Sequence, residues 1–122
     1  MITLLAFKRL RLRGGCTIVQ VEEVKHPLRD ALGREATALT SIHGTRLSVL
    51  ISAGLSPRDL SVTLYHEVLE AVAVASEDPP ITVMEFNEGD FERAAQMMHD
   101  RLGEASPANL NRMLQLHGFP EK

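Results

Sequence analysis

Apolar and polar positions alternate along the first half of the chain, which predicts β-strands there. Apolar residues recur at about every second position in segment 16–24, and segment 36–42 is a further candidate strand. The run 46–52 is richer in apolar and β-branched residues, as is typical of a buried strand, and His43-Gly44 marks a turn before it. Because the connections are too short for helical crossovers, we expect an antiparallel or mixed sheet. Segment 2–12 fits either a strand or a short helix.

The second half changes to a helical pattern whose first start is well marked. Ser56 can cap a helix N-terminus, and Pro57 occupies the first helical position, where its missing N–H costs nothing. The helix can continue to about Ser76, because Pro79-Pro80 prevents it from going much further.

Two further helices are predicted downstream. Asn87 or Asp90 can cap one that ends near Gly103, and Ser106 opens another that Gly118 closes. Strands followed by helices predict an α+β fold, in which a small sheet from the N-terminal half packs against these helices.

Length, charge and cysteine content narrow the possible classes of protein. A chain of 122 residues fits one domain, residues 1–122, and its net charge of -3 gives no general case for nucleic-acid binding. No apolar run approaches transmembrane length, so we expect no membrane association. The lone Cys16 excludes an internal disulfide or a cysteine metal cage, and a cytoplasmic location is the expectation.

The segment His66-Glu67-Val68-Leu69-Glu70 is the strongest candidate for chemistry. Residues four apart on a helix are offset by about 40° and lie one turn above each other, so His66 and Glu70 can bind one cation together. Glu67 lies about 100° from His66 around the axis, from where its carboxylate can reach a water on the metal. A polar stripe is more often simply a solvated helix face. This helix is so apolar elsewhere that both flanks must be covered, which favours a stripe inside a groove.

Segments 47–52, 54–57 and 63–70 together resemble the strand and active-site helix of the gluzincin-type zinc metallopeptidases. In that family a strand leads into a capped helix that carries Thr-Leu-x-His-Glu-x-x-His. The chain has Thr63-Leu64-Tyr65-His66-Glu67 and then departs from the family, with Glu70 at the position of the second histidine. The resemblance covers residues 47–76.

The same resemblance continues weakly downstream, where segment 86–90, Phe-Asn-Glu-Gly-Asp, is similar to the family helix that supplies a glutamate as third ligand. It implies a zincin-like fold and a metal held by His66, Glu70 and Glu88. It also implies that Glu67 activates a metal-bound water for peptide hydrolysis. The expected partner is then a peptide or protein.

The third ligand has alternatives from helical geometry. If residues 88–102 are helical, then Glu88, Glu92 and His99 fall within about 40° of one another, and we rank them in that order. One histidine with two carboxylates is a harder donor set than most zinc sites. Zinc is therefore the first expectation, with manganese, iron or calcium, or no metal at all, as alternatives.

Two functions follow from this site. The first is a small metal-dependent peptidase. The alternative is a catalytically inactive zincin-like fold that serves as an interaction or regulatory module, which the substituted motif favours.

Overall fold

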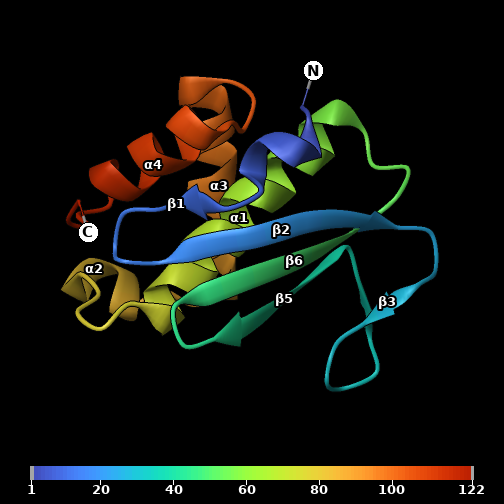
Figure 1. Cartoon of the computed structure of the whole chain (residues 1–122), viewed down its shortest axis with the longest axis horizontal. Helices are drawn as coiled ribbons and strands as arrows, with labels where there is room; N and C mark the ends of the chain where they lie inside the picture. Colours follow the sequence, from blue (N-terminus) through green and yellow to red (C-terminus); the bar gives the residue numbers. More distant parts are fainter. Residues whose placement is uncertain (1, 122) are drawn as a thin grey trace.

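The alternating first half of the chain forms a four-stranded mixed sheet in the computed structural model, which describes residues 2–121 (Figure 1). The strand order is β1-β2-β6-β5; β2 and β6 are parallel, whereas β1 and β5 lie antiparallel to their neighbours. The expectation of a mixed sheet is thus confirmed. The strands are β1 (Leu10–Arg11), β2 (Thr17–Val24), β5 (Ala38–His43) and β6 (Arg46–Ser52).

The connection between the parallel strands β2 and β6 contains no helix. It first forms a two-stranded hairpin of β3 (Leu28–Arg29) and β4 (Glu35–Ala36), and then returns along β5. The strand predicted over 36–42 is therefore shifted. Its first residue, Ala36, pairs with Leu28 in the small hairpin, and the strand of the main sheet begins at Ala38.

The N-terminal segment, for which a strand and a short helix were both open, contains both. A 3-10 helix, η1 (Leu4–Phe7), is followed by the short strand β1. Phe7 is only 1% exposed, so η1 anchors an aromatic ring in the core rather than lying loosely on the surface.

The predicted helices are present, and their caps are those that the sequence indicates. Helix α1 (Pro57–Ala75) starts after Ser56, whose side chain accepts a hydrogen bond from the N–H of Asp59 at 3.1 Å. Helix α3 (Glu88–Leu102) starts with a reciprocal pair in which Asn87 and Asp90 each bind the other's backbone N–H. The third, α4 (Pro107–Leu116), opens at its predicted serine. The short helix α2 (Ile81–Met84) was not predicted.

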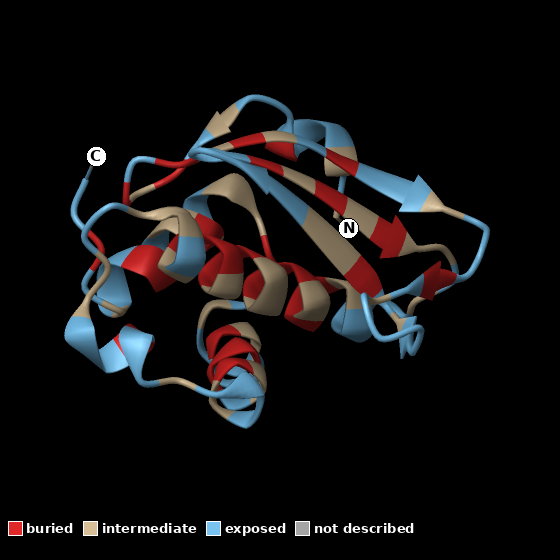
Figure 2. Cartoon of the chain, turned by 90° about the horizontal axis from the view of Figure 1, so that it is seen from below, coloured by how far each residue is buried: buried red, intermediate tan, exposed pale blue. Residues whose placement is uncertain are grey.

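Helix α1 lies between the sheet on one side and α3 on the other, so the fold has three layers at this point (Figure 2). Its apolar positions are buried on both flanks, as Leu64, Leu69 and Val72 at 0% exposure illustrate. The hydroxyl of Tyr65 donates a 2.8 Å hydrogen bond to the carbonyl of Gly103 and ties α1 to the end of α3. Within residues 2–121, no helix has both the length and the apolar character needed to cross a bilayer.

Gly14, in the turn between β1 and β2, packs tightly against α1. Its φ is +86°, and a Cβ added there would lie 2.9 Å from Cγ1 of Val72 and 3.0 Å from Cδ1 of Phe119. Its N–H donates to the carbonyl of Pro120 at 2.9 Å. This glycine therefore lets the N-terminal turn, α1 and the C-terminal segment meet.

Replacement of Gly14 by alanine is expected to lower the free energy of unfolding by about 3 kcal/mol, through backbone strain plus overpacking against Val72. Gly44→Ala is the matched control, because Gly44 also has a positive φ, of +65°, but has no atom within 4 Å of the added Cβ. It should cost only about 1 kcal/mol. Urea unfolding at neutral pH measures both, and equal losses would contradict the close-packing account.

Candidate metal centre

His66, Glu67 and Glu70 gather on the side of α1 that faces a groove. One donor atom from each residue can be chosen so that all three lie within 4.8 Å of one another, and all three side chains are half-buried. The helical spacing is the cause, because it places His66 and Glu70 one turn apart on the same side of the helix. The three side chains form a group that could hold a metal ion.

Helix α3 adds two carboxylates to this group. Oε2 of Glu88 lies 3.3 Å from Nε2 of His66, and Oε1 of Glu92 lies 2.9 Å from Nδ1 of the same ring. The ring of Phe91 stacks on His66 with its centroid 6.3 Å away and an angle of 19° between the planes. Three residues of α3 thus fix the position of one histidine of α1.

The two carboxylates occupy different sides of the imidazole, which separates their roles. With Nδ1 donating to Glu92, the neutral ring carries its lone pair on Nε2, on the side of Glu88. A histidine that binds a metal commonly donates its other ring N–H to a carboxylate in this way. The geometry therefore suits Glu88 as a ligand beside Nε2 and Glu92 as the residue that orients the ring.

His99, the third candidate for this position, has a different neighbour. Its Nδ1 lies 2.8 Å from Oγ of Ser61, a buried hydroxyl that also accepts the N–H of Ala105 at 2.8 Å. His99 is not among the residues that line the groove. The structure brings Glu88 and Glu92 to His66 but does not bring His99 there.

Glu67 is held from the sheet. The hydroxyl of Thr40, on β5, donates a 2.8 Å hydrogen bond to Oε1 of Glu67. This contact leaves the second carboxylate oxygen of Glu67 available for another partner. Thr40 was not predicted as a site residue, and nothing in its position on a strand distinguishes it from other polar strand residues.

The Glu70 and Glu88 carboxyls lie close enough to shift each other's pKa. Burial, together with the hydrogen bond and the charge of Glu88, raises the pKa of Glu70 to about 7. The same hydrogen bond, and more weakly the charge of His66, lowers the pKa of Glu88. A protonated Glu70 thus avoids the repulsion between two neighbouring negative charges beside His66.

The pKa of His66 reflects opposing causes. Burial on its own would lower the pKa of the ring, but the hydrogen bond with Glu92 and the charges of Glu67, Glu70 and Glu88 together raise it above the usual value. The surroundings thus favour positive charge at this position, which is the electrostatic condition that a cation site requires.

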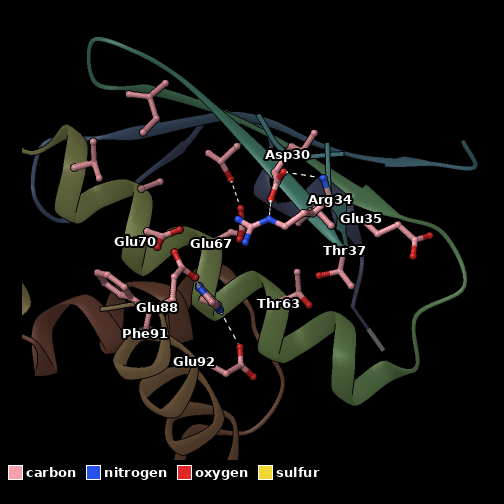
Figure 3. Close-up of a pocket in the computed structure, with 18 residues that line it drawn as sticks. Asp30, Arg34, Glu35, Thr37, Thr63, Glu67, Glu70, Glu88, Phe91 and Glu92 are labelled. Atoms are coloured by element: carbon pink, nitrogen blue, oxygen red, sulfur yellow. Dashed lines mark hydrogen bonds and ion pairs between the residues drawn. The ribbon is translucent and has the colours of Figure 1, made fainter. Parts of the chain in front are cut away.

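The groove around these residues has a volume of about 880 Å³ and lies between α1, α3, strand β5 and the β3–β4 hairpin (Figure 3). The hairpin contributes Asp30 and Arg34, which were not predicted as site residues. Their only sequence signal is the turn pattern Asp30-x-x-Gly33-Arg34, which predicts a tight loop but not its position over the groove. Apart from Arg34, the charged groups that line the groove are carboxylates and His66.

The donor set fits a divalent metal. A cation between Nε2 of His66 and the oxygens of Glu70 and Glu88 would take the place of a proton on Glu70 and remove the repulsion between the carboxylates. Nitrogen and carboxylate oxygen donors of this kind bind zinc as well as harder ions, so the residues themselves do not define one metal.

Comparison with protein-family models, curated proteins and solved structures finds no match to this chain. The likeness to the gluzincin peptidases therefore rests on the local sequence alone.

Glu70→Gln is expected to change how stability depends on pH. With a folded-state pKa of about 7 against an ordinary 4.5, Glu70 favours the folded state at acid pH, and this contribution is lost as the pH rises to about 7. The glutamine variant stays neutral and can still donate to Glu88, so at pH 8 it should be more stable than the wild type by about 1 kcal/mol, after allowance for partial exposure. At pH 5 the two should differ little. Chemical unfolding at both pH values tests this, and a variant less stable at pH 8 would contradict it.

Glu92→Gln should weaken metal binding about 10- to 100-fold, because the ring of His66 loses the carboxylate that fixes its tautomer and orientation. Competition with a chromogenic chelator measures the affinity. Glu35→Gln, which also lines the groove but has no recorded contact with His66, is the control and should bind metal like the wild type. Unchanged affinity in Glu92→Gln would exclude an orienting role.

Proposed function

We propose that this protein binds one divalent transition-metal ion, zinc in the first place, through His66, Glu70 and Glu88, and that it hydrolyses peptide bonds. The observation that carries the proposal is the meeting of the Glu70 and Glu88 carboxyls beside Nε2 of His66, whose other nitrogen is held by Glu92. Two acidic groups from different helices come together at a place where a cation would neutralise both.

The position of Glu67 supports hydrolysis. A bound metal would supply Lewis-acid polarisation of the carbonyl and lower the pKa of the attacking water. Glu67 belongs to the same group of donors as His66 and Glu70 and has one oxygen fixed by Thr40. Its other oxygen is placed to accept a proton from water, in the role of a general base.

Glu67 alone can carry the proton from the attacking water to the leaving nitrogen. The water oxygen bonds to the carbonyl carbon, its proton passes to Glu67, and the electron pair of the C=O π bond moves onto the carbonyl oxygen. As the C–N bond breaks, that pair restores a C=O bond and Glu67 delivers the proton to the departing nitrogen. The products are a carboxylic acid, which ionises, and an amine.

The wall of the groove formed by β5 supports an extended peptide as the substrate. Among the described residues β5 pairs with β6 alone, so its other edge offers backbone N–H and C=O groups, and Ala38, Leu39 and Thr40 line the groove. An extended peptide can add to such an edge as a further strand. A peptide lying along β5 would pass Glu67, since Thr40 already touches it.

A non-catalytic metal-binding or interaction module is the second candidate, and Glu70 is the observation in its favour. A carboxylate where the gluzincins have histidine adds negative charge to the donor set, and this makes water at the metal less acidic. Metal binding without hydrolysis would identify this case.

Elemental analysis of the protein purified without a metal-binding tag should find about one equivalent of metal per chain. His66→Ala and Glu70→Ala should lose it, because each removes one of the donors. Glu67→Gln should keep the metal and lose peptide cleavage by at least about 100-fold, because only the general base is removed. His43→Ala, which alters an exposed histidine outside the groove, is the control and should match the wild type.

Each outcome of this experiment has a separate meaning. Wild-type protein that stays metal-free after zinc is added back would overturn the whole proposal. Metal that is retained in His66→Ala would place the site elsewhere. Metal bound as expected but no cleavage of a peptide library would leave the second candidate.

A further inference from the structure

Arg34 is the one arginine or lysine among the described residues that line the groove. It is the last residue of the loop between β3 and β4, and this hairpin forms the wall that faces α1 and α3. Figure 3 shows its side chain extending from the hairpin in the direction of the carboxylates of α1. A single cation thus lies on the side of the groove opposite to the candidate ligands.

The loop that carries Arg34 is organised by Asp30. Oδ1 of Asp30 accepts the N–H groups of Leu32 and Arg34 at 2.9 and 3.0 Å, and Oδ2 accepts Nε of Arg34 at 2.9 Å. Backbone hydrogen bonds join Asp30 to Gly33 and Arg34 as well. The guanidinium is therefore directed by a defined loop although its side chain is 72% exposed.

The hydrogen bonds recorded for the Arg34 side chain use Nε alone, which leaves both Nη groups for a ligand in the groove. Its charge also reaches the centre: after the hydrogen bond from Glu70 and the charge of His66, Arg34 contributes to lowering the pKa of Glu88. Arg34 is therefore near the candidate metal centre without being bonded to it.

Hydrolysis of a peptide bond creates a negative charge that the side chains of α1 and α3 do not stabilise, apart from the metal that they would hold. When water adds to the carbonyl carbon, negative charge develops on the carbonyl oxygen. The groups that α1 and α3 bring to the centre are mostly carboxylates, which repel this charge. A positively charged donor on the opposite wall would stabilise it, and a guanidinium does so with two N–H groups in a fixed plane.

We propose that Arg34 is a catalytic residue that donates through its Nη groups to the scissile carbonyl oxygen as negative charge develops there. This inference rests on the proposed function, because it assigns the oxyanion-stabilising group of the same reaction. It also places the substrate between the hairpin and α1, with the carbonyl oxygen facing Arg34.

The test compares zinc-loaded wild type with Arg34→Met, Arg34→Ala and the control Arg46→Met, an exposed arginine that does not line the groove. Removal of one such donor lowers kcat by about 100- to 1000-fold in other enzymes, and we expect this range for Arg34→Met. KM should change by no more than about threefold, because the interaction is made in the transition state. Arg46→Met should behave like the wild type.

Three further measurements separate this role from a structural one. The affinity of a phosphinic peptide, whose tetrahedral anion imitates the transition state, should fall in Arg34→Met by about the same factor as kcat. The zinc content should stay at the wild-type value, since Arg34 is not a ligand. Added guanidinium ion at millimolar concentration should restore part of the activity of Arg34→Ala, which a collapsed loop would not allow.

The outcomes distinguish this inference from the proposal on which it rests. Wild-type cleavage with undiminished kcat and phosphinic-peptide affinity in Arg34→Met would overturn the role of Arg34 and leave the peptidase intact. Loss of zinc in Arg34→Met would also overturn it, by showing that the arginine supports the metal centre. Zinc-loaded wild type that neither cleaves peptides nor binds the phosphinic peptide would remove both proposals together.

Discussion

The apolar flanks of α1 pack against the sheet on one side and against α3 on the other, and the placement of the site follows from this burial. A helix covered on both flanks can expose only a narrow strip, and in this chain the strip holds His66, Glu67 and Glu70. Since α3 covers one side of the strip and β5 the other, each layer supplies partners: Glu88 and Glu92 from the helix, and Thr40 from the strand. The hydrophobic contacts that stabilise the fold thereby also determine which polar groups meet.

The fold was largely predictable, because its signals are local. Strand alternation and the serine, asparagine and proline residues at helix starts act over a few residues, and they located β2, β6, α1, α3 and α4 closely. The sequence did not reveal how β2 and β6 pair in parallel without a helical crossover, since that depends on the excursion through the β3–β4 hairpin. The later start of the strand predicted at 36–42 was missed for the same reason: Ala36 pairs with a short strand that has no distinctive pattern.

The site was predictable only where it lies on one helix. His66, Glu67 and Glu70 come together through helical spacing, which the sequence contains. The ranking of Glu88, Glu92 and His99 could not be decided from their nearly equal angles on α3, because the result depends on the position of each along the helix axis relative to His66. Glu88 and Glu92 lie within reach, whereas His99, two turns or more beyond them, meets Ser61. Thr40 and Arg34 come from segments far away in the sequence, and only the tertiary fold shows their proximity.

The hydrogen bond from Thr40 to Glu67 connects the edge of the sheet with the candidate general base. On the proposed function, the strand that receives the peptide backbone is also the strand that orients the proton acceptor. Residues of a peptide that pair with β5 far from the cleaved bond would therefore influence the alignment of Glu67, and longer peptides would gain in turnover as well as in affinity. The turnover rate would then increase with the length of peptide that pairs with the edge of the sheet.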